Sequence, residues 1–157
     1  AIREASEDIE IVAGCVAVND SSSGTNIDGI EFKSKKLLNH LRNSDSIILF
    51  GATIGVGADT LVRKCSVTDV AMTSIVHCVG ASLVENLCDK ACDELKITIK
   101  GEHRPRFSPG YGDLCISSQA DFFKLLPMTK QLGVTLSEEF MMTPTKTVTA
   151  FIGVIKD

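Results

Sequence analysis

The sequence has no run of about 18 apolar residues free of charge, which is the length that a membrane-spanning helix needs. Its first residues, Ala-Ile-Arg-Glu-Ala-Ser-Glu-Asp, lack the charged-then-apolar pattern of an export signal. It also lacks an excess of basic residues, because the net charge is −4 and the pI is about 5.4. No global field therefore favours nucleic acid or an anionic membrane surface, and we expect neither as a partner.

The sequence also lacks internal repeats and low-complexity linkers, so we expect one domain spanning residues 1–157. At 44% apolar residues, a chain of this length can bury roughly 70% of its unfolded surface. The glycine-rich stretch at residues 51–57 matches neither G-x-G-x-x-G nor G-x-x-x-x-G-K-[ST]. The nucleotide-binding folds therefore lack their specific residues.

The six cysteines lie in apolar, patterned segments rather than in loops. This placement suits free thiols in a reducing compartment, so we expect a cytoplasmic protein without a disulfide framework. Only Cys88 and Cys92 have a ligand-like spacing, and a zinc site would need two more ligands. We therefore interpret these two cysteines as packing residues and expect no metal.

β-Branched and small residues predict a strand over residues 9–18, and a brief strand over residues 134–136 follows Gly133. Alternation of residue types predicts a half-buried strand over residues 145–155. The apolar run at residues 46–50 predicts a buried strand that ends at the glycine-rich stretch. Ser34 is placed to cap a short helix over residues 35–42, and a further helix over residues 119–126 ends at Pro127. Helices among antiparallel-looking strands predict an α+β fold.

The longest helical pattern opens at Ser66-Val-Thr-Asp69, which has capping-box spacing with Asp in place of Glu, and runs to about Leu95. One face of this helix is a stripe of small side chains interrupted by a single carboxylate, Glu85. An unpaired buried carboxylate is too costly, so Glu85 either pairs with an arginine or faces a ligand. The stripe comprises Ala71, Ser74, Cys78, Ala81, Glu85, Cys88 and Cys92.

The loop at residues 104–113 concentrates chemistry that a packed core cannot easily use. Gly110 and Gly112 permit positive φ or close approach of another group, and such a loop offers N–H groups to a ligand. Arg106 adds a planar fork for a carboxylate or phosphate, and Tyr111 adds a flat face with a hydroxyl. These residues suit a small, anionic, partly aromatic ligand. The alternative is a surface turn whose arginines pair with nearby carboxylates.

The sequence Arg106-Phe-Ser-Pro-Gly-Tyr111, followed after a helix by Met141-Met-Thr-Pro-Thr-Lys-Thr-Val-Thr-Ala150, resembles the activation domain family of cobalamin-dependent methionine synthase. The likeness extends back to about Phe32 and is strongest to the short, stand-alone activation subunits. Leu83-Val-Glu85 matches a Leu-x-Glu context on the family's preceding helix, and Thr53-Ile-Gly55 with Asp59 matches a Thr-Leu-Gly followed by Asp. The long enzyme's N-terminal aspartate contact and later tyrosine contact have no counterpart here.

The resemblance implies a twisted, mostly antiparallel sheet with helices packed on it. It also implies S-adenosylmethionine binding for the reductive methylation of cob(II)alamin, with cobalamin held by a methionine synthase subunit and an electron from a flavodoxin- or ferredoxin-type donor. The chain would then be a subunit of a methyltransferase rather than an independent enzyme, with no catalytic residue of its own. The implied ligand contacts are Glu85, Arg106, Ser108, Gly110 and Tyr111.

Two other functions remain open at the level of sequence. The chain could be a non-catalytic binding subunit that docks on and stabilises a cobalamin or corrinoid methyltransferase. It could also be an independent enzyme with Cys115 as nucleophile, for which His103 would be the available base. Binding of S-adenosylmethionine separates the first alternative from the reactivation function, and replacement of Cys115 tests the second.

Overall fold

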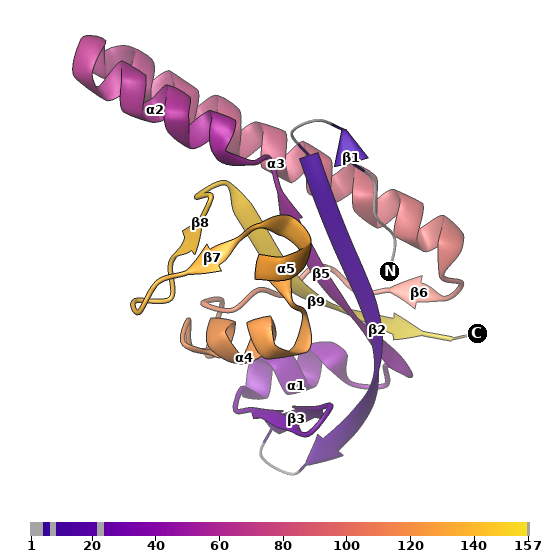
Figure 1. The fold of residues 1–157 in the computed structure, drawn as a ribbon. Helices are drawn as coiled ribbons and strands as arrows, with labels where there is room; N and C mark the ends of the chain where they lie inside the picture. Colours follow the sequence, from indigo (N-terminus) through magenta and orange to yellow (C-terminus); the bar gives the residue numbers. More distant parts are fainter. Residues whose placement is uncertain (1–4, 7–8, 22–23, 157) are drawn as a thin grey trace.

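The computed structural model describes the backbone of residues 5–6, 9–21 and 24–156, and the side chains of residues 24–156. Its centre is an antiparallel sheet with the strand order β4-β3-β2-β5-β9-β6, in which β1 also pairs with β2 (Figure 1). The strands are β1 (Ala5–Ser6), β2 (Ile9–Ser21), β3 (Gly24–Ile27), β4 (Ile30–Phe32), β5 (Ser46–Thr53), β6 (Glu102–His103) and β9 (Thr147–Ile155). Two further short strands, β7 (Thr135–Leu136) and β8 (Met142–Thr143), form a separate antiparallel pair.

The predicted strands are present, and two of them are longer than expected. β2 continues to Ser21, and β5 continues through Gly51 to Thr53 rather than ending at residue 50. The prediction that the last strand is half-buried is wrong, because all but two of its residues are buried. The reason is that helices cover both faces of the sheet, which alternation along one strand does not reveal.

Two apolar clusters explain this burial. On one face, Phe151 of β9 and Leu49 of β5 pack with α1 (Lys35–Leu41), α4 (Ser118–Leu125) and α5 (Met128–Leu132). On the other face, Ile152 and Ile48 pack against α3 (Val70–Thr98). Successive side chains of a strand point to opposite faces, so each central strand contributes to both clusters. The fold is α+β, as predicted.

The local helix signals are largely confirmed. The Ser34 hydroxyl accepts the Leu37 N–H at 2.9 Å and caps α1, as the sequence predicts. The helix over residues 119–126 is α4, and the chain turns at Pro127 before the short α5. Leu37 and Leu41 of α1 are fully buried, which fixes this helix against the sheet beside the 104–113 loop.

The predicted start of the longest helix is wrong. Residues 56–68 already form a helix, α2 (Val56–Thr68), and Ser66 lies inside it with its hydroxyl donating to the Arg63 carbonyl. The break falls at Asp69, whose extended backbone ends α2 and whose carboxylate accepts the Met72 N–H at 3.0 Å to cap α3. The glycines at positions 55 and 57 hid α2, since glycine is a poor helix former.

α2 and α3 therefore form a helical hairpin, and Figure 1 shows it projecting beyond the end of the sheet. The C-terminal half of α3 packs on the sheet through Val84, Cys88, Ala91 and Leu95. Within the described residues, α3 is the one helix that is long and apolar enough to cross a membrane by length and composition. Of the predicted small-residue stripe, only Cys88 is buried and Cys92 is half-buried, whereas the other members are exposed.

Candidate functional site

The first half of the 104–113 loop runs beside β9 as an extension of the sheet edge. The Arg104 N–H donates to the Gly153 carbonyl at 2.8 Å, and Phe107 exchanges two hydrogen bonds with Phe151 at 2.8 and 2.9 Å. Phe107 is buried below the loop. The backbone of Arg106 is therefore fixed by its neighbours, and its side chain is held at a defined position on the sheet edge.

The second half of the loop is a compact turn that uses its own backbone groups. Gly110 and Gly112 have φ values of 87° and 66°, which confirms the predicted need for glycine. The Gly110 N–H donates to the Leu114 carbonyl at 2.9 Å, and the Tyr111 N–H donates to the Ser108 carbonyl at 3.1 Å. The expectation of free N–H groups is therefore wrong for Gly110 and Tyr111, because the turn itself consumes them.

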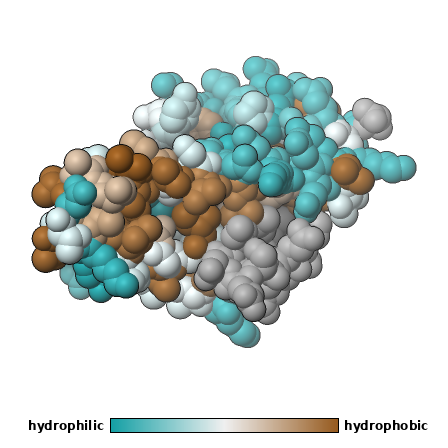
Figure 2. Space-filling view, turned by 90° about the horizontal axis from the view of Figure 1, so that it is seen from above, coloured by the Kyte–Doolittle hydropathy of each residue, from teal (hydrophilic) through white to brown (hydrophobic). Residues whose placement is uncertain are grey.

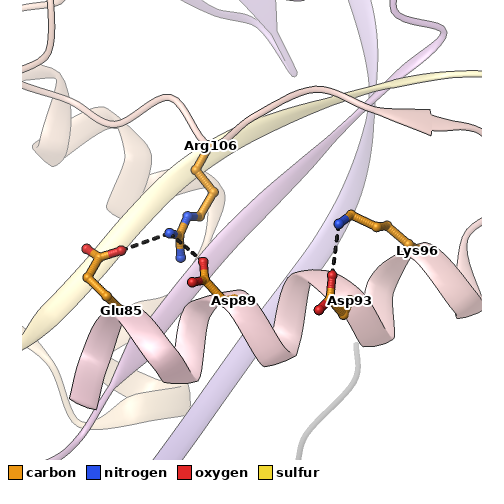
Figure 3. Close-up of polar contacts among 5 residues, drawn as sticks. All are labelled: Glu85, Asp89, Asp93, Lys96 and Arg106. Atoms are coloured by element: carbon orange, nitrogen blue, oxygen red, sulfur yellow. Dashed lines mark hydrogen bonds and ion pairs between the residues drawn. The ribbon is translucent and has the colours of Figure 1, made fainter. Parts of the chain in front are cut away.

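The Arg106 guanidinium lies against two carboxylates on consecutive turns of α3. Its Nη2 donates to Glu85 Oε2 at 2.8 Å and to Asp89 Oδ1 at 3.0 Å (Figure 3). Residues four apart lie on one helix face, so both acids reach the same nitrogen. Sequence reasoning named Glu85 and Arg106 as separate ligand contacts and an arginine pair as the alternative for Glu85. The structure brings these two residues into contact, together with Asp89, which sequence reasoning missed.

The solvent exposure of the three side chains determines how strongly this cluster holds Arg106. The side chains of Glu85 and Asp89 are 59% and 73% exposed, whereas that of Arg106 is 21% exposed. Exposed ion pairs contribute only about 0 to 1 kcal/mol each, so they hold Arg106 weakly. Its other terminal nitrogen, Nη1, is buried and has no hydrogen-bond partner in the described part of the chain. The guanidinium is thus held in place by Nη2, which contacts both carboxylates, and these exposed contacts can be exchanged for others.

Two hollows flank this stretch of the loop, and residues 104–106 line both. The one towards α3, of about 430 Å³, includes Asp89, Cys92 and Lys96. The one towards α1, of about 580 Å³, contains no acid among its lining residues, which are Lys36, Asn39, His40, Arg104, Pro105, Arg106, Phe107 and Tyr111.

Tyr111 forms the outer wall of the hollow towards α1. Its ring is 68% exposed and stands edge-on to Phe107, with centroids 5.5 Å apart. His40 Nε2 donates to the Pro105 carbonyl at 2.8 Å, which ties α1 to the loop. An exposed aromatic face beside a half-buried guanidinium suits a ligand that joins a planar ring to an anionic group. Ser108 is half-buried behind this wall.

Asp113 is the last residue of the 104–113 loop, and the sequence analysis assigned it no function. Its carboxylate accepts the Ser34 hydroxyl and the N–H groups of Lys35, at 2.9 Å, and Lys36, at 3.2 Å. The hydrogen bond from Ser34, followed by those from the Lys36 and Lys35 backbone, lowers the pKa of Asp113. Asp113 therefore fastens the end of the loop to the start of α1. No local signal could have found this contact, because Ser34 and Asp113 are 79 residues apart in the sequence.

The second segment of the resemblance, residues 141–150, is also fastened by an acid. Asp59 of α2 accepts the Thr145 N–H at 2.8 Å and its hydroxyl. The Thr147 hydroxyl donates to the Thr53 hydroxyl at 2.9 Å, which links the start of β9 to the end of β5. Asp59 and Thr53 thus join residues 53–59 to residues 141–150, and neither of them lies in the Arg106 cluster.

The cysteines and histidines whose side chains the structure describes form no metal cluster. The residues with described side chains contain no group of three or more His, Cys, Asp or Glu placed to hold an ion. Burial raises the pKa of the Cys92 thiol to about 11, so it is protonated at neutral pH. The Ser117 hydroxyl donates to Cys115 at 3.0 Å and lowers the pKa of Cys115, whereas His103 donates to the Ile99 carbonyl. The base proposed for Cys115 is therefore occupied elsewhere.

No protein-family profile matches the sequence, and no curated protein matches it either. A solved structure does match the fold: the MetH reactivation domain bound to AdoHcy, with a TM-score of 0.59 and 19% sequence identity. The match covers 95% of this chain and 59% of that chain, so this protein spans less than two thirds of its structural neighbour's length. The chain therefore has, over almost its whole length, the α+β fold of that reactivation domain.

Proposed function

We propose that this chain binds S-adenosylmethionine as the reactivation module of a cobalamin-dependent methionine synthase. The observation that carries the proposal is the Arg106 cluster beside Tyr111, on a fold shared with a reactivation domain that was solved with AdoHcy. The quoted loop and strand motifs give the same assignment. S-adenosylmethionine and AdoHcy share an adenosine and an amino acid end, so one site can hold both.

The charges of the cluster match the methionine end of the ligand. That end carries a carboxylate and an ammonium, and the cluster offers one guanidinium and two carboxylates within 3.0 Å of it. Arg106 would bind the carboxylate of the ligand through Nη2, exchanging its bond to Asp89 for one to the ligand. Glu85 would accept from the ammonium. The ligand would then exchange a solvent-exposed, charge-assisted bond within the chain for one of the same kind to itself.

The remaining contacts follow from the loop. The Tyr111 ring is exposed at the mouth of the hollow towards α1 and would pack against the ligand. Because the Gly110 N–H is occupied, Gly110 would contribute its carbonyl, and Ser108 its backbone or hydroxyl. Phe107 and Asp113 position this loop without contacting the ligand, since one is buried under it and the other holds α1.

When bound, S-adenosylmethionine would supply the methyl group that, with one electron from a flavodoxin- or ferredoxin-type donor, converts cob(II)alamin on the partner subunit to methylcobalamin. This chain's own residues bind and orient. Arg106 and Glu85 fix the amino acid end of the ligand, which leaves the sulfonium methyl free to face the partner. The role requires positioning rather than a proton transfer within this chain.

Isothermal titration of the purified chain with S-adenosylmethionine and with AdoHcy tests the proposal directly. We expect saturable binding of both at one site, weakened at least about tenfold in Arg106→Ala and unchanged in Arg63→Ala, an exposed arginine on α2. Absence of heat with either ligand, together with binding to a corrinoid methyltransferase, would instead support the non-catalytic stabilising subunit. Unchanged affinity in Arg106→Ala would move the site away from this loop.

A further inference from the structure

The α2–α3 hairpin exposes an unusual amount of apolar surface. Nine of the twelve large apolar side chains that are exposed among the described residues lie on it, and eight of these nine lie between residues 56 and 83. The first half of α3, residues 70–84, contains no Asp, Glu, Lys or Arg. Figure 2, which views the molecule from above, shows a brown apolar patch at the end where the hairpin projects. The eight are Val56, Leu61, Val67, Val70, Met72, Ile75, Val79 and Leu83.

A helix that is apolar on most of its surface is normally buried, and a contiguous exposed apolar patch marks a binding surface. The described part of the chain covers only the C-terminal half of α3, because Val84, Cys88, Ala91 and Leu95 pack on the sheet while the first half projects. Charges return at Glu85 and continue to Lys96. The exposed half of α3 is thus an unfilled interface rather than a solvated surface.

The hairpin face is also grooved. A hollow of about 460 Å³ lies between the two helices, with Leu61 of α2 and Leu83 of α3 among its lining residues. Small residues, Gly57 and Gly80 among them, form part of the wall, and a Cβ placed on Gly57 would meet nothing within 4 Å. The groove therefore has space for side chains inserted from another molecule.

The size of the face is what a symmetric dimer needs. α2 is 13 residues long, which is about 20 Å, and the groove continues along α3 for roughly 10 Å more to Lys90. Two adjacent helices are roughly 20 Å wide, so the face covers on the order of 500 Å² per copy. Two copies facing each other would bury about 1,000 Å², which is the lower limit for a specific interface.

The lack of charge favours a second copy over a different protein. In a two-fold interface the same patch meets itself, so residue i of one copy contacts residue j of the other and j contacts i, and the patch must be complementary to itself. A charge close to the two-fold axis would meet its own copy. The first half of α3 brings no such charge, and its mixture of ridges and an open groove can interdigitate with itself. We infer that this chain forms a symmetric homodimer in which two α2–α3 hairpins pack face to face as a four-helix bundle. This inference does not rest on the proposed function.

Analytical ultracentrifugation of the chain between about 1 and 100 μM tests the inference. We expect a species of twice the 16.8 kDa monomer mass. Leu61→Glu and Leu83→Glu, which change half-exposed side chains on different helices, should each raise the dimer dissociation constant at least tenfold. Ile97→Glu is the matched control, because Ile97 is 82% exposed at the far end of α3, outside the groove. Circular dichroism checks that each variant is folded.

Three results would overturn the homodimer. The first is a monomer at 100 μM. The second is a dimer that folded Leu61→Glu and Leu83→Glu leave unchanged, which would place the interface elsewhere. The third is a monomer that floats with phosphatidylcholine vesicles, which would make the hairpin a membrane-binding surface. A dimer that both glutamate variants weaken, and Ile97→Glu does not, supports the four-helix arrangement.

Discussion

Arg106 is held by two carboxylates on consecutive turns of one helix, and one of its terminal nitrogens serves both of them. A guanidinium with an unused, buried Nη1 lacks the full set of bonds that its five donors can make. The two acids keep it extended over the loop in the absence of ligand. At the scale of single residues, the candidate site is therefore preorganised by weak bonds that a ligand can displace.

Arg106→Ala should weaken S-adenosylmethionine binding by roughly ten- to a hundredfold, since a charge-assisted hydrogen bond contributes about 1.5 to 3 kcal/mol. Arg106→Lys should recover only part of this loss, because an ammonium cannot reproduce the planar fork. Isothermal titration measures both, with Arg63→Ala as the control. Equal affinities of the alanine variant and the original chain would contradict an Arg106 contact.

Glu85→Gln separates a ligand contact from a purely structural ion pair. The side chain is 59% exposed, and Arg106 keeps its bond to Asp89, so the melting temperature of the free protein should change little. Affinity for S-adenosylmethionine should fall about tenfold if Glu85 accepts from the ligand ammonium. Asp89→Asn is the matched control, with an expected change in affinity below about threefold. A lower melting temperature with unchanged affinity in Glu85→Gln would remove Glu85 from the site.

The cysteines should differ in reactivity as their surroundings differ. The pKa of Cys92 is raised to about 11 by burial, whereas the pKa of the exposed Cys115 is lowered by Ser117. Because the thiolate is the reactive form, iodoacetamide at pH 7.5 should modify Cys115 well before Cys92. Mass spectrometry of digested samples gives the order, and Ser117→Ala should slow the Cys115 reaction. Faster modification of Cys92 would show that the C-terminal half of α3 does not pack as described.

At the scale of elements, the loop is a bridge between three parts of the fold. Phe107 joins it to β9, His40 joins it to α1, and Asp113 closes its far end on the α1 N-terminus. α3 approaches it from the other side through Glu85 and Asp89. The site is therefore built at the junction of one strand and two helices, and movement of any of them would move Arg106 or Tyr111.

Asp113→Asn tests the link between the loop and α1. The pKa of Asp113 is lowered in the folded protein by Ser34 and by the Lys36 and Lys35 N–H groups, so its charged form is favoured by folding. Its contribution is present above the unfolded pKa, about 3.9, and is lost as the pH falls through the lower folded pKa. The variant should melt below the original chain at pH 7, and this gap should close towards pH 3.

Differential scanning fluorimetry across pH 3 to 7 measures that gap. Glu138→Gln provides a control, because it removes an exposed carboxylate away from the loop. A gap that stays constant with pH would mean that the stabilisation comes from the shape of the side chain rather than from its charge.

At the scale of the whole molecule, the protein has two candidate binding surfaces, one charged and one apolar. The Arg106 cluster lies against Glu85 and Asp89 of α3. The apolar face lies on the hairpin, which projects beyond the sheet (Figure 1). α3 connects them, since its charged half faces Arg106 and its uncharged half lies in the hairpin. Ligand binding and association with another chain can therefore occur together without competing for the same residues.

Binding of S-adenosylmethionine should stabilise the whole fold, because a ligand that binds only the folded state shifts unfolding by mass action. At a ligand concentration about a hundred times Kd, the gain is about 2.7 kcal/mol, or roughly 5 to 10 °C in Tm for a chain of this size. Thermal scans with S-adenosylmethionine and, as control, adenosine alone measure the shift. An equal shift with adenosine would show that the amino acid end, and hence Arg106, adds nothing.

The sequence by itself determined the features that depend on neighbouring residues. The strand periods, the Ser34 cap, the stop at Pro127 and the positive φ of Gly110 and Gly112 are all local, and the structure has each of them. The α+β class followed from the order of these elements. The end of α2 and the cap at Asp69 were also local, but glycines at the start of α2 and the competing Ser66 signal obscured them.

Only the tertiary structure decided which of these elements meet. The bond between Ser34 and Asp113 spans 79 residues, and that between Asp59 and Thr145 spans 86, so no spacing in the sequence could indicate either. The pairing of Arg106 with Glu85 also depended on where the loop crosses α3. Whether a helix face is covered is likewise a property of the packed molecule, because it depends on where the sheet ends under α3.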